Sequence, residues 1–210
     1  MAVPPRASRA ASATRPLGAD YFERYGVNTA GVVKRDYARN WRHFTFHVPE
    51  ILRTFRAVTG RRPVNFLDIG AADGRLMRLA LKAGLEAHGI ENAPYILARI
   101  EDENLKRLIT VGDAAVAIRD VAAGSRDIIV ECAAQYLPPR RLARYLRHVA
   151  RACAPGGMVC LLVDPRNYQD DPAPAHTGVQ TFETITWWRR RMKGCGMRRI
   201  PGHDFYFVKA

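Results

Sequence analysis

The sequence predicts an α/β fold: a doubly wound, mostly parallel seven-stranded sheet with an antiparallel C-terminal hairpin and helices on both faces. From residue 64 onward, short apolar runs alternate with amphipathic helical patterns, as expected when helices connect parallel strands. Near the C-terminus, two apolar runs flank Pro201 and Gly202, which is typical of an antiparallel hairpin.

The predicted strands are short apolar runs, and several of them are rich in β-branched residues. In chain order they are residues 64–69, 86–90, 108–111, 127–130, 158–163, 197–200 and 205–208. The predicted helices have apolar residues at helical spacing and a Gly or Pro near one end. In chain order they are residues 48–58, 74–82, 94–103, a helix that Pro138 opens and Gly156-Gly157 ends, and residues 181–193.

Length and composition favour a globular protein. The chain has 210 residues, of which 48% are hydrophobic and 25% charged, so it can form one large domain or two small ones. No uncharged apolar run approaches the ~18–20 residues that span a bilayer, so we expect no membrane-spanning segment. The four cysteines show no CxxC spacing. We therefore expect no metal site and no disulfide framework, but free thiols in a cytoplasmic protein.

Positive charge is unevenly distributed. Residues 1–63 hold 12 Lys/Arg and 4 Asp/Glu, residues 64–137 hold 8 and 11, and residues 138–210 hold 13 and 5, so the net charges are +8, −3 and +8. Two basic flanks suggest a polyanionic partner, either nucleic acid or a phosphorylated compound. An arginine-rich, GC-rich coding bias explains the same numbers equally well. The arginines on the polar face of the fourth predicted helix indicate a solvated surface; they are Arg140, Arg141, Arg144, Arg147 and Arg151.

The chain divides into three predicted parts. Residues 1–17 contain Ala, Ser, Pro and Arg without an acid, which predicts a disordered basic tail. The same composition is typical of an organellar transit peptide, in which case the location would be an organellar matrix. Residues 18–62 mix aromatic and basic side chains and end in a helix, which predicts a segment that covers substrate. Residues 63–210 hold the predicted sheet.

A glycine-rich loop follows the first strand of the sheet and opens a helix. It occupies residues 67–74, and its small residues let a ligand approach the backbone closely. A dinucleotide site needs G-x-G-x-x-G, with the last glycine packing the helix against the sheet. Counted from Gly70, that position holds Arg75, which argues against NAD.

The loop resembles motif I of class I S-adenosylmethionine-dependent methyltransferases, which reads acid-x-Gly-x-Gly-x-Gly. The corresponding residues here are Asp68, Gly70, Ala72 and Gly74, so an alanine replaces the middle glycine. Three further features follow in the order that the family has them. They are Glu91 at the end of the second strand, Gly112-Asp113 after the third strand, and a Pro-Gly-Gly turn in residues 154–157 before the fifth strand.

The resemblance implies a Rossmann-like methyltransferase domain in residues 63–210 with S-adenosyl-L-methionine as its cofactor. It places Glu91 near the ribose hydroxyls and Asp113 near the adenine amino group. An acidic central segment also suits a cationic cofactor. The cofactor-binding residues implied in this way are Asp68, Gly70, Ala72, Gly74, Glu91, Asn92, Gly112, Asp113, Ala114, Glu131 and Cys132.

The acceptor side is less specific. The loop after the fourth strand lacks the Asn-Pro-Pro-Tyr signature, which disfavours a DNA base or a glutamine amide as acceptor. Glu131 and His176 are candidate general bases, and residues 164–180 are a candidate lid. Aromatic and polar side chains before the sheet and near these loops are candidate substrate-binding residues. They are Tyr21, Tyr25, Tyr37, Trp41, Gln135, Arg166 and Tyr168.

Three functions remain open at this point. The first is in-line methyl transfer to an oxygen or nitrogen of a small-molecule acceptor. The second is methyl transfer to RNA or to a ribosomal protein that the basic flanks bind. The third is a catalytically silent assembly factor with a methyltransferase-like fold. Under the first two, Asp68→Ala and Glu91→Ala are each expected to weaken cofactor binding without unfolding the chain.

Overall fold

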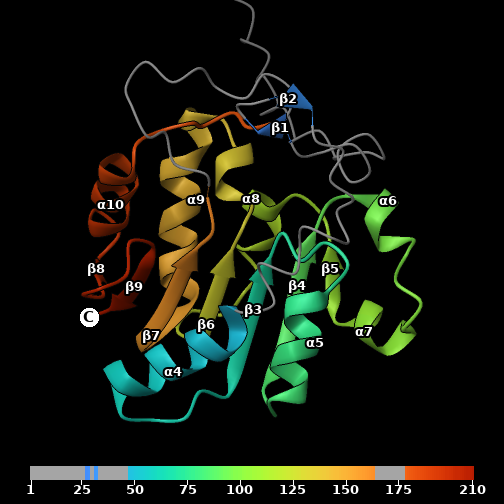
Figure 1. The fold of residues 1–210 in the computed structure, drawn as a ribbon, viewed down its shortest axis with the longest axis horizontal. Helices are drawn as coiled ribbons and strands as arrows, with labels where there is room; N and C mark the ends of the chain where they lie inside the picture. The colour runs from blue at the N-terminus through green and yellow to red at the C-terminus, as the bar shows by residue number, and fades with distance from the viewer. Residues whose placement is uncertain (1–26, 29–30, 33–46, 164–177) are drawn as a thin grey trace, which may run out of the picture.

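The computed structural model describes residues 27–28, 31–32, 47–163 and 178–210. Most of these residues form one sheet and the helices that cover its two faces (Figure 1). The strands of this sheet are β3 (Asn65–Ile69), β4 (Glu86–Glu91), β5 (Ile109–Val111), β6 (Arg126–Glu131), β7 (Cys153–Leu161), β8 (Met197–Arg199) and β9 (Tyr206–Lys209). A separate antiparallel pair is formed by β1 (Val27–Asn28) and β2 (Gly31–Val32).

The strand order of the seven-stranded sheet is β5-β4-β3-β6-β7-β9-β8. β5, β4, β3, β6 and β7 are parallel to one another, whereas β9 pairs antiparallel with both β7 and β8. The predicted fold class, including the antiparallel C-terminal hairpin, is therefore confirmed. The connections reverse direction between β3 and β6, and ligands of such sheets bind at the carboxyl ends of the strands at this point.

Helices cover the two faces of the sheet and bury a separate core on each. One face packs against α4 (His47–Thr59), α5 (Arg75–Lys82), α6 (Pro94–Leu97) and α7 (Glu103–Arg107). The other packs against α8 (Ala114–Ala117), α9 (Pro139–Ala152) and α10 (Ile185–Lys193), and a short 3-10 helix, η1 (Ala134–Tyr136), follows β6. α4 contributes Ile51 and Phe55 to the first core. The predicted domain boundary at residue 63 stays a prediction.

The helix predicted over residues 94–103 is wrong as a single element. The structure has α6 and α7 instead, separated by residues 98–102. The Asp102 side chain accepts hydrogen bonds from the amides of Asn104 (3.0 Å) and Leu105 (3.1 Å), so it caps a new helix. Ile100 is buried between the two helices. The apolar residues have helical spacing, but the cap at Asp102 and the burial of Ile100 divide the segment into two helices.

The end of α9 also differs from the expectation. The helix stops at Ala152, and β7 begins at Cys153. The Pro-Gly-Gly sequence thus lies inside a strand and not in a turn before it. The β6–β7 register shifts between Arg126 and Ile128, which accommodates the extra residues as a bulge. Gly157 leaves no room for a side chain, since a Cβ would lie 2.8 Å from the Ala154 carbonyl oxygen.

Two further differences concern helices. α10 begins at Ile185 and not at residue 181, because the Thr184 hydroxyl caps it by accepting a hydrogen bond from the Trp187 amide. α8 was not predicted; Asp113 caps it in the same way. Among the described residues, no helix combines the length and apolar character that crossing a bilayer requires.

Candidate functional site

Three acidic residues lie at or near the carboxyl ends of adjacent strands. Glu91 ends β4, Asp68 is the penultimate residue of β3, and Glu131 ends β6. In the parallel register Ile69 is paired with both Ile90 and Glu131. All three carboxyl groups are therefore concentrated around the point where the sheet connections reverse, at the upper edge of the sheet in Figure 1.

Glu91 holds the glycine-rich loop by its carboxylate. One oxygen, Oε2, accepts a hydrogen bond from the Ala72 amide at 2.8 Å. The other, Oε1, accepts from the amides of Asn92 (2.7 Å) and Ala93 (2.8 Å). The loop is also tied to β4 by the Gly70 amide, which donates to the Ile90 carbonyl oxygen at 2.8 Å. Glu91 is thus part of the architecture of the loop as well as a candidate ligand.

The loop conformation explains its small residues. Gly70 and Gly74 have φ values of 82° and 74°, in the left-handed region that favours glycine. A Cβ at Gly74 would lie 2.9 Å from Leu105 Cδ2. Ala72, with φ 49°, is the only described residue other than glycine with a positive φ. Its methyl group packs into a small apolar cluster with Ala93 and Ile96, so the structure accepts alanine at the middle position.

Asp68 fits a cationic ligand. Its side chain points to the α5 face of the sheet and is 1% exposed, and Oδ1 has no hydrogen-bond partner within the described part of the chain. Burial, and then the negative charges of Glu91 and Asp73, raise the pKa of Asp68 to about 8. A sulfonium or ammonium group nearby would favour the ionised carboxylate. The residues present therefore suit a cationic cofactor.

Glu131 is oriented differently. It alternates with Val130 along β6, so its side chain points to the α9 face, opposite to Asp68. Its Oε1 atom accepts hydrogen bonds from the Tyr145 hydroxyl (2.6 Å) and the Ala133 amide (2.8 Å). Burial raises the pKa of Glu131 to about 7 even though these hydrogen bonds act in the opposite direction. A role as general base stays a prediction, and the structure adds a positioning role beneath the loop after β6.

Cys132 follows Glu131 and is partly buried. Burial, with the charges of Asp68 and Glu131 adding to it, raises the pKa of Cys132 well above its ordinary value. A thiol in such surroundings is a poor nucleophile. It lies against the glycine-rich loop, since a Cβ built on Gly70 would be 3.3 Å from Cys132 Cβ.

Gly112 and Asp113 lie at the same edge of the sheet. The Gly112 amide donates to the Glu91 carbonyl oxygen at 2.9 Å. The Asp113 carboxylate accepts from the Ala115 amide at 2.8 Å and forms an ion pair with Arg141 Nη2 at 3.0 Å. Arg141 had been expected on a solvated face, but its side chain is 13% exposed. The proposed contact of Asp113 with adenine stays a prediction.

Gln135 lies in η1 and is buried. Its carbonyl oxygen accepts from the amides of Gln180 (2.8 Å) and Thr181 (3.0 Å), and the Thr181 hydroxyl donates to the Leu137 carbonyl oxygen at 2.6 Å. The chain after residue 177 is therefore fastened beside the loop that follows β6. Sequence reasoning missed Thr181 and Tyr145 as parts of the site; the only signal for Tyr145 was its place in the apolar stripe of α9.

The remaining candidates cannot be placed. The expected substrate-binding and acid–base residues outside the described residues are Tyr21, Tyr25, Tyr37, Trp41, Arg166, Tyr168 and His176. Asn92 and Ala114 are described. Asn92 directly follows Glu91, which binds the glycine-rich loop, and Ala114 directly follows Asp113, which caps α8.

Comparisons with known proteins agree with this fold. Residues 66–157 match the family described as "Methyltransferase domain". A comparison of the sequence with curated proteins found no match. A SAM-dependent methyltransferase from Archaeoglobus fulgidus has a similar structure, with a TM-score of 0.56, 15% identity and coverage of 78% of this chain and 75% of that one. A provisionally named sarcosine dimethylglycine methyltransferase from Galdieria sulphuraria is also similar, with a TM-score of 0.57, 23% identity and coverage of 74% of this chain and 63% of that one.

A third similar structure contains a bound product of the cofactor. It is phosphoethanolamine N-methyltransferase 2 from Haemonchus contortus with phosphomonomethylethanolamine and S-adenosylhomocysteine, with a TM-score of 0.53, 20% identity and coverage of 71% of this chain and 37% of that one. At sequence identities this low, the structural similarity shows a shared fold and nothing more. Residues 66–157 thus resemble a methyltransferase domain, and the chain has the fold of the SAM-dependent methyltransferases named above.

Proposed function

We propose that the protein transfers the methyl group of S-adenosylmethionine to an oxygen or nitrogen of a small-molecule acceptor. The observation that carries the proposal is the buried carboxyl group of Asp68, which has an unpartnered oxygen beside Glu91 where the sheet connections reverse. A buried acid without a partner is costly unless a ligand supplies one. The bound cofactor would supply the electrophilic methyl group.

The cofactor side of the site consists of the loop and the two acids that flank it. Gly70 and Gly74 allow the backbone amides to approach a ligand. Asp68 would lie near positive charge, and Glu91 would keep its backbone contacts while its remaining lone pairs accept from ribose hydroxyls. Residues that would complete the binding surface are Ala72, Asn92, Gly112, Asp113, Ala114 and Cys132.

The acceptor side would lie above the loop that follows β6. Glu131 and Tyr145 fix this loop from below, and Gln135 holds residues 180–181 against it. Rigid placement of the acceptor favours in-line attack on a methyl group. The similar structures named for sarcosine dimethylglycine and phosphoethanolamine methyl transfer support a small acceptor. We also propose a cytoplasmic location, as expected from four cysteines that show no CxxC spacing.

Two measurements test the proposal on the full chain. Calorimetry should show binding of S-adenosylmethionine to the wild type, weaker binding to Asp68→Asn, and unchanged binding to Glu86→Gln, because Glu86 is exposed at the opposite end of β4. Transfer of labelled methyl groups to cell extract should place the label in the small-molecule fraction. Label in the RNA or protein fraction would show that the acceptor is RNA or protein and not a small molecule. No cofactor binding at millimolar concentration would leave only the assembly-factor function.

A further inference from the structure

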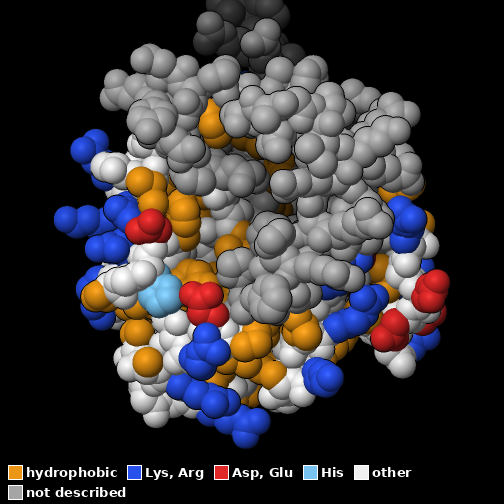
Figure 2. Space-filling model, viewed as in Figure 1, with side chains coloured by type: hydrophobic (Ala, Val, Ile, Leu, Met, Phe, Trp, Pro, Cys, Tyr) orange, Lys and Arg blue, Asp and Glu red, His pale blue; other side chains and the backbone are white. Residues whose placement is uncertain are grey.

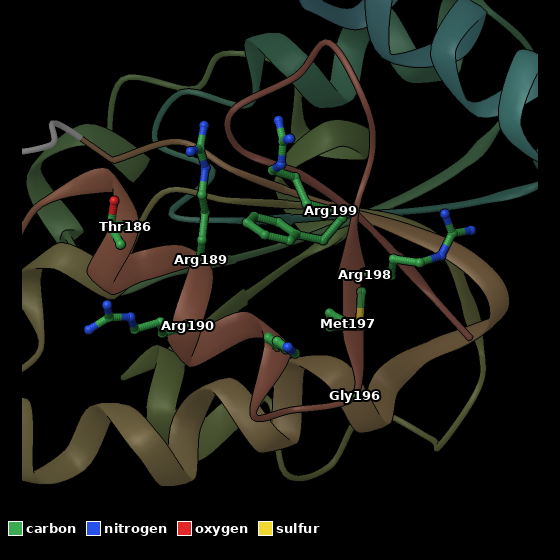
Figure 3. Close-up of a pocket in the computed structure, with 9 residues that line it drawn as sticks. Thr186, Arg189, Arg190, Gly196, Met197, Arg198 and Arg199 are labelled. Atoms are coloured by element: carbon green, nitrogen blue, oxygen red, sulfur yellow. The ribbon is translucent and has the colours of Figure 1, made fainter.

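A basic groove lies at the far edge of the sheet, between α10 and the β8–β9 hairpin. Its volume is about 520 Å³, and Figure 3 shows the side chains around it. The residues that line it are Thr186, Arg189, Arg190, Lys193, Gly196, Met197, Arg198, Arg199 and Phe207. This basic groove is separated from β6 by β7 and β9, about 14 Å at ordinary strand spacing. It is therefore distinct from the cofactor site.

Among the described residues, few acidic side chains pair with the cations of the basic groove. Residues 185–200 contain six Lys/Arg and no Asp/Glu. Asp204 forms an ion pair with Arg189. Within the described part of the chain, the exposed side chains of Arg190, Lys193 and Arg198 form no ion pair. Figure 2 shows Lys and Arg side chains gathered at the edge of the molecule over α10 and β8. A surface of this kind attracts polyanions.

The positive surface continues from α10 onto α9. Burial raises the pKa of the Cys195 thiol, and the nearby charges of Arg147 on α9 and Arg191 on α10 act in the opposite direction. Cations of both helices thus lie around one residue. Arg140 and Arg144 add exposed charge to α9.

The directions of the side chains distinguish a single anion from a chain of anions. In Figure 3, Arg189 and Arg199 extend to the same side, whereas Arg190 and Arg198 point to opposite sides. A pocket for one phosphate would converge its donors on one point. Cations that point to different sides of the β8 edge match successive phosphates of an extended strand that runs along this edge instead.

We propose that the basic groove binds the backbone of a single strand of RNA. β8 is the terminal strand of the sheet, so its outer backbone N–H and C=O groups are available beside the cations. A ribose 2′-hydroxyl both donates and accepts hydrogen bonds, which suits such an edge and distinguishes RNA from DNA. This inference goes beyond the proposed function, since it assigns a surface away from the methyl-transfer site and does not depend on the identity of the acceptor.

The proposal predicts a salt dependence. Four phosphate contacts, from Arg190, Lys193, Arg198 and Arg199, give a slope of log affinity against log salt of about −2.8 for a single strand. Affinity should therefore fall about 50-fold between 50 and 200 mM salt. Replacing three of the four cations should reduce the slope to about −0.7.

The test compares two triple variants of the full chain. The groove variant is Arg190→Gln with Lys193→Gln and Arg198→Gln. The matched control removes three exposed cations from α4 and α5, away from the β8 edge, and is Arg53→Gln with Arg78→Gln and Lys82→Gln. Fluorescence anisotropy measures binding of a labelled single-stranded RNA, the corresponding DNA and polyglutamate, and calorimetry measures S-adenosylmethionine binding to the same proteins.

RNA binding that weakens at least tenfold at 50 mM salt in the groove variant, with the control close to wild type, supports the proposal. Equal losses in both variants, or a wild type that does not bind RNA, overturn it. Tighter binding of DNA or polyglutamate overturns the assignment to RNA. Unchanged cofactor binding in the groove variant shows that it is folded. A wild type that binds RNA but not the cofactor would contradict the proposed function alone.

Discussion

The carboxyl ends of β3 and β4 and the β8 edge of the same sheet differ in both charge and burial. Asp68 and Glu91 are 1% and 7% exposed, whereas Arg190, Lys193 and Arg198 are exposed to solvent. Buried acids lose hydration and acquire raised pKa values, so a cationic ligand there recovers a large free energy. Exposed cations keep their hydration, and each contributes little until a polyanion engages several together.

This difference predicts that single substitutions act strongly at the first region and weakly at the second. The largest effect is expected for Glu91→Ala, which leaves three backbone amides without their acceptor. We expect a loss of about 3 kcal/mol in the free energy of unfolding, together with loss of cofactor binding. Urea unfolding and calorimetry measure the two. Glu86→Ala, at the exposed end of the same strand, should stay within about 0.5 kcal/mol of wild type.

Gly74→Ala is expected to cost about 2.5 kcal/mol. The residue has a left-handed φ, and the added methyl group would meet Leu105 at 2.9 Å. Gly156→Ala on β7 is the matched control, because Gly156 has φ 67° but no atom within 4 Å of a Cβ. It should cost only about 1 kcal/mol. Equal thermal-unfolding shifts in the two variants would show that the packing of α7 against the loop contributes nothing.

Asp68→Asn should lower cofactor affinity about 30-fold at pH 8, corresponding to about 2 kcal/mol for a charged hydrogen bond. The pKa of Asp68 is raised from 3.8 to about 8, so the folded protein retains a proton that the unfolded chain loses. Its contribution to stability is therefore present at low pH and is lost as pH rises from about 4 to 8. Denaturant unfolding should show a steeper decline in the wild type than in Asp68→Asn, which keeps the raised pKa of Glu131.

The same pKa predicts how cofactor affinity changes with pH. Ionised Asp68 should attract a cation, so wild-type affinity should rise at least tenfold from pH 6 to pH 8. The Asp68→Asn variant is the control, since its pH dependence reports ionisation of the cofactor's own groups. Identical pH profiles for the two proteins would remove Asp68 from the cofactor site.

The smallest effect is expected for Ala72→Gly. Glycine relieves the positive φ of this residue, which favours the variant by about 1 kcal/mol. It also loses the buried methyl group and gains freedom in the unfolded chain. The free energy of unfolding should change by less than about 0.5 kcal/mol. A larger increase in the free energy of unfolding, measured by urea titration, would indicate that the loop between β3 and α5 is strained.

Local sequence patterns were sufficient for most of the fold. β-branched runs and helical spacing located the strands of the sheet within a residue or two, except for β7, because the periodicities of buried strands and amphipathic helices are local properties. Capping was harder to recognise. Asp102 and Thr184 set helix boundaries through side-chain hydrogen bonds, which a periodic pattern does not reveal.

The sequence by itself determined the order of the elements and the acid and glycine positions of the loop between β3 and α5, since these follow from spacing along one chain. Only the tertiary structure decided which partners these side chains meet. Glu91 holds three amides, Glu131 meets Tyr145 on the opposite face, and Arg141 pairs with Asp113. Apart from the bonds of Glu91 to the neighbouring amides of Asn92 and Ala93, these contacts join segments that the parallel register of the sheet and the packing of α9 bring together. Their energies depend on burial, which exists only once the layers are assembled.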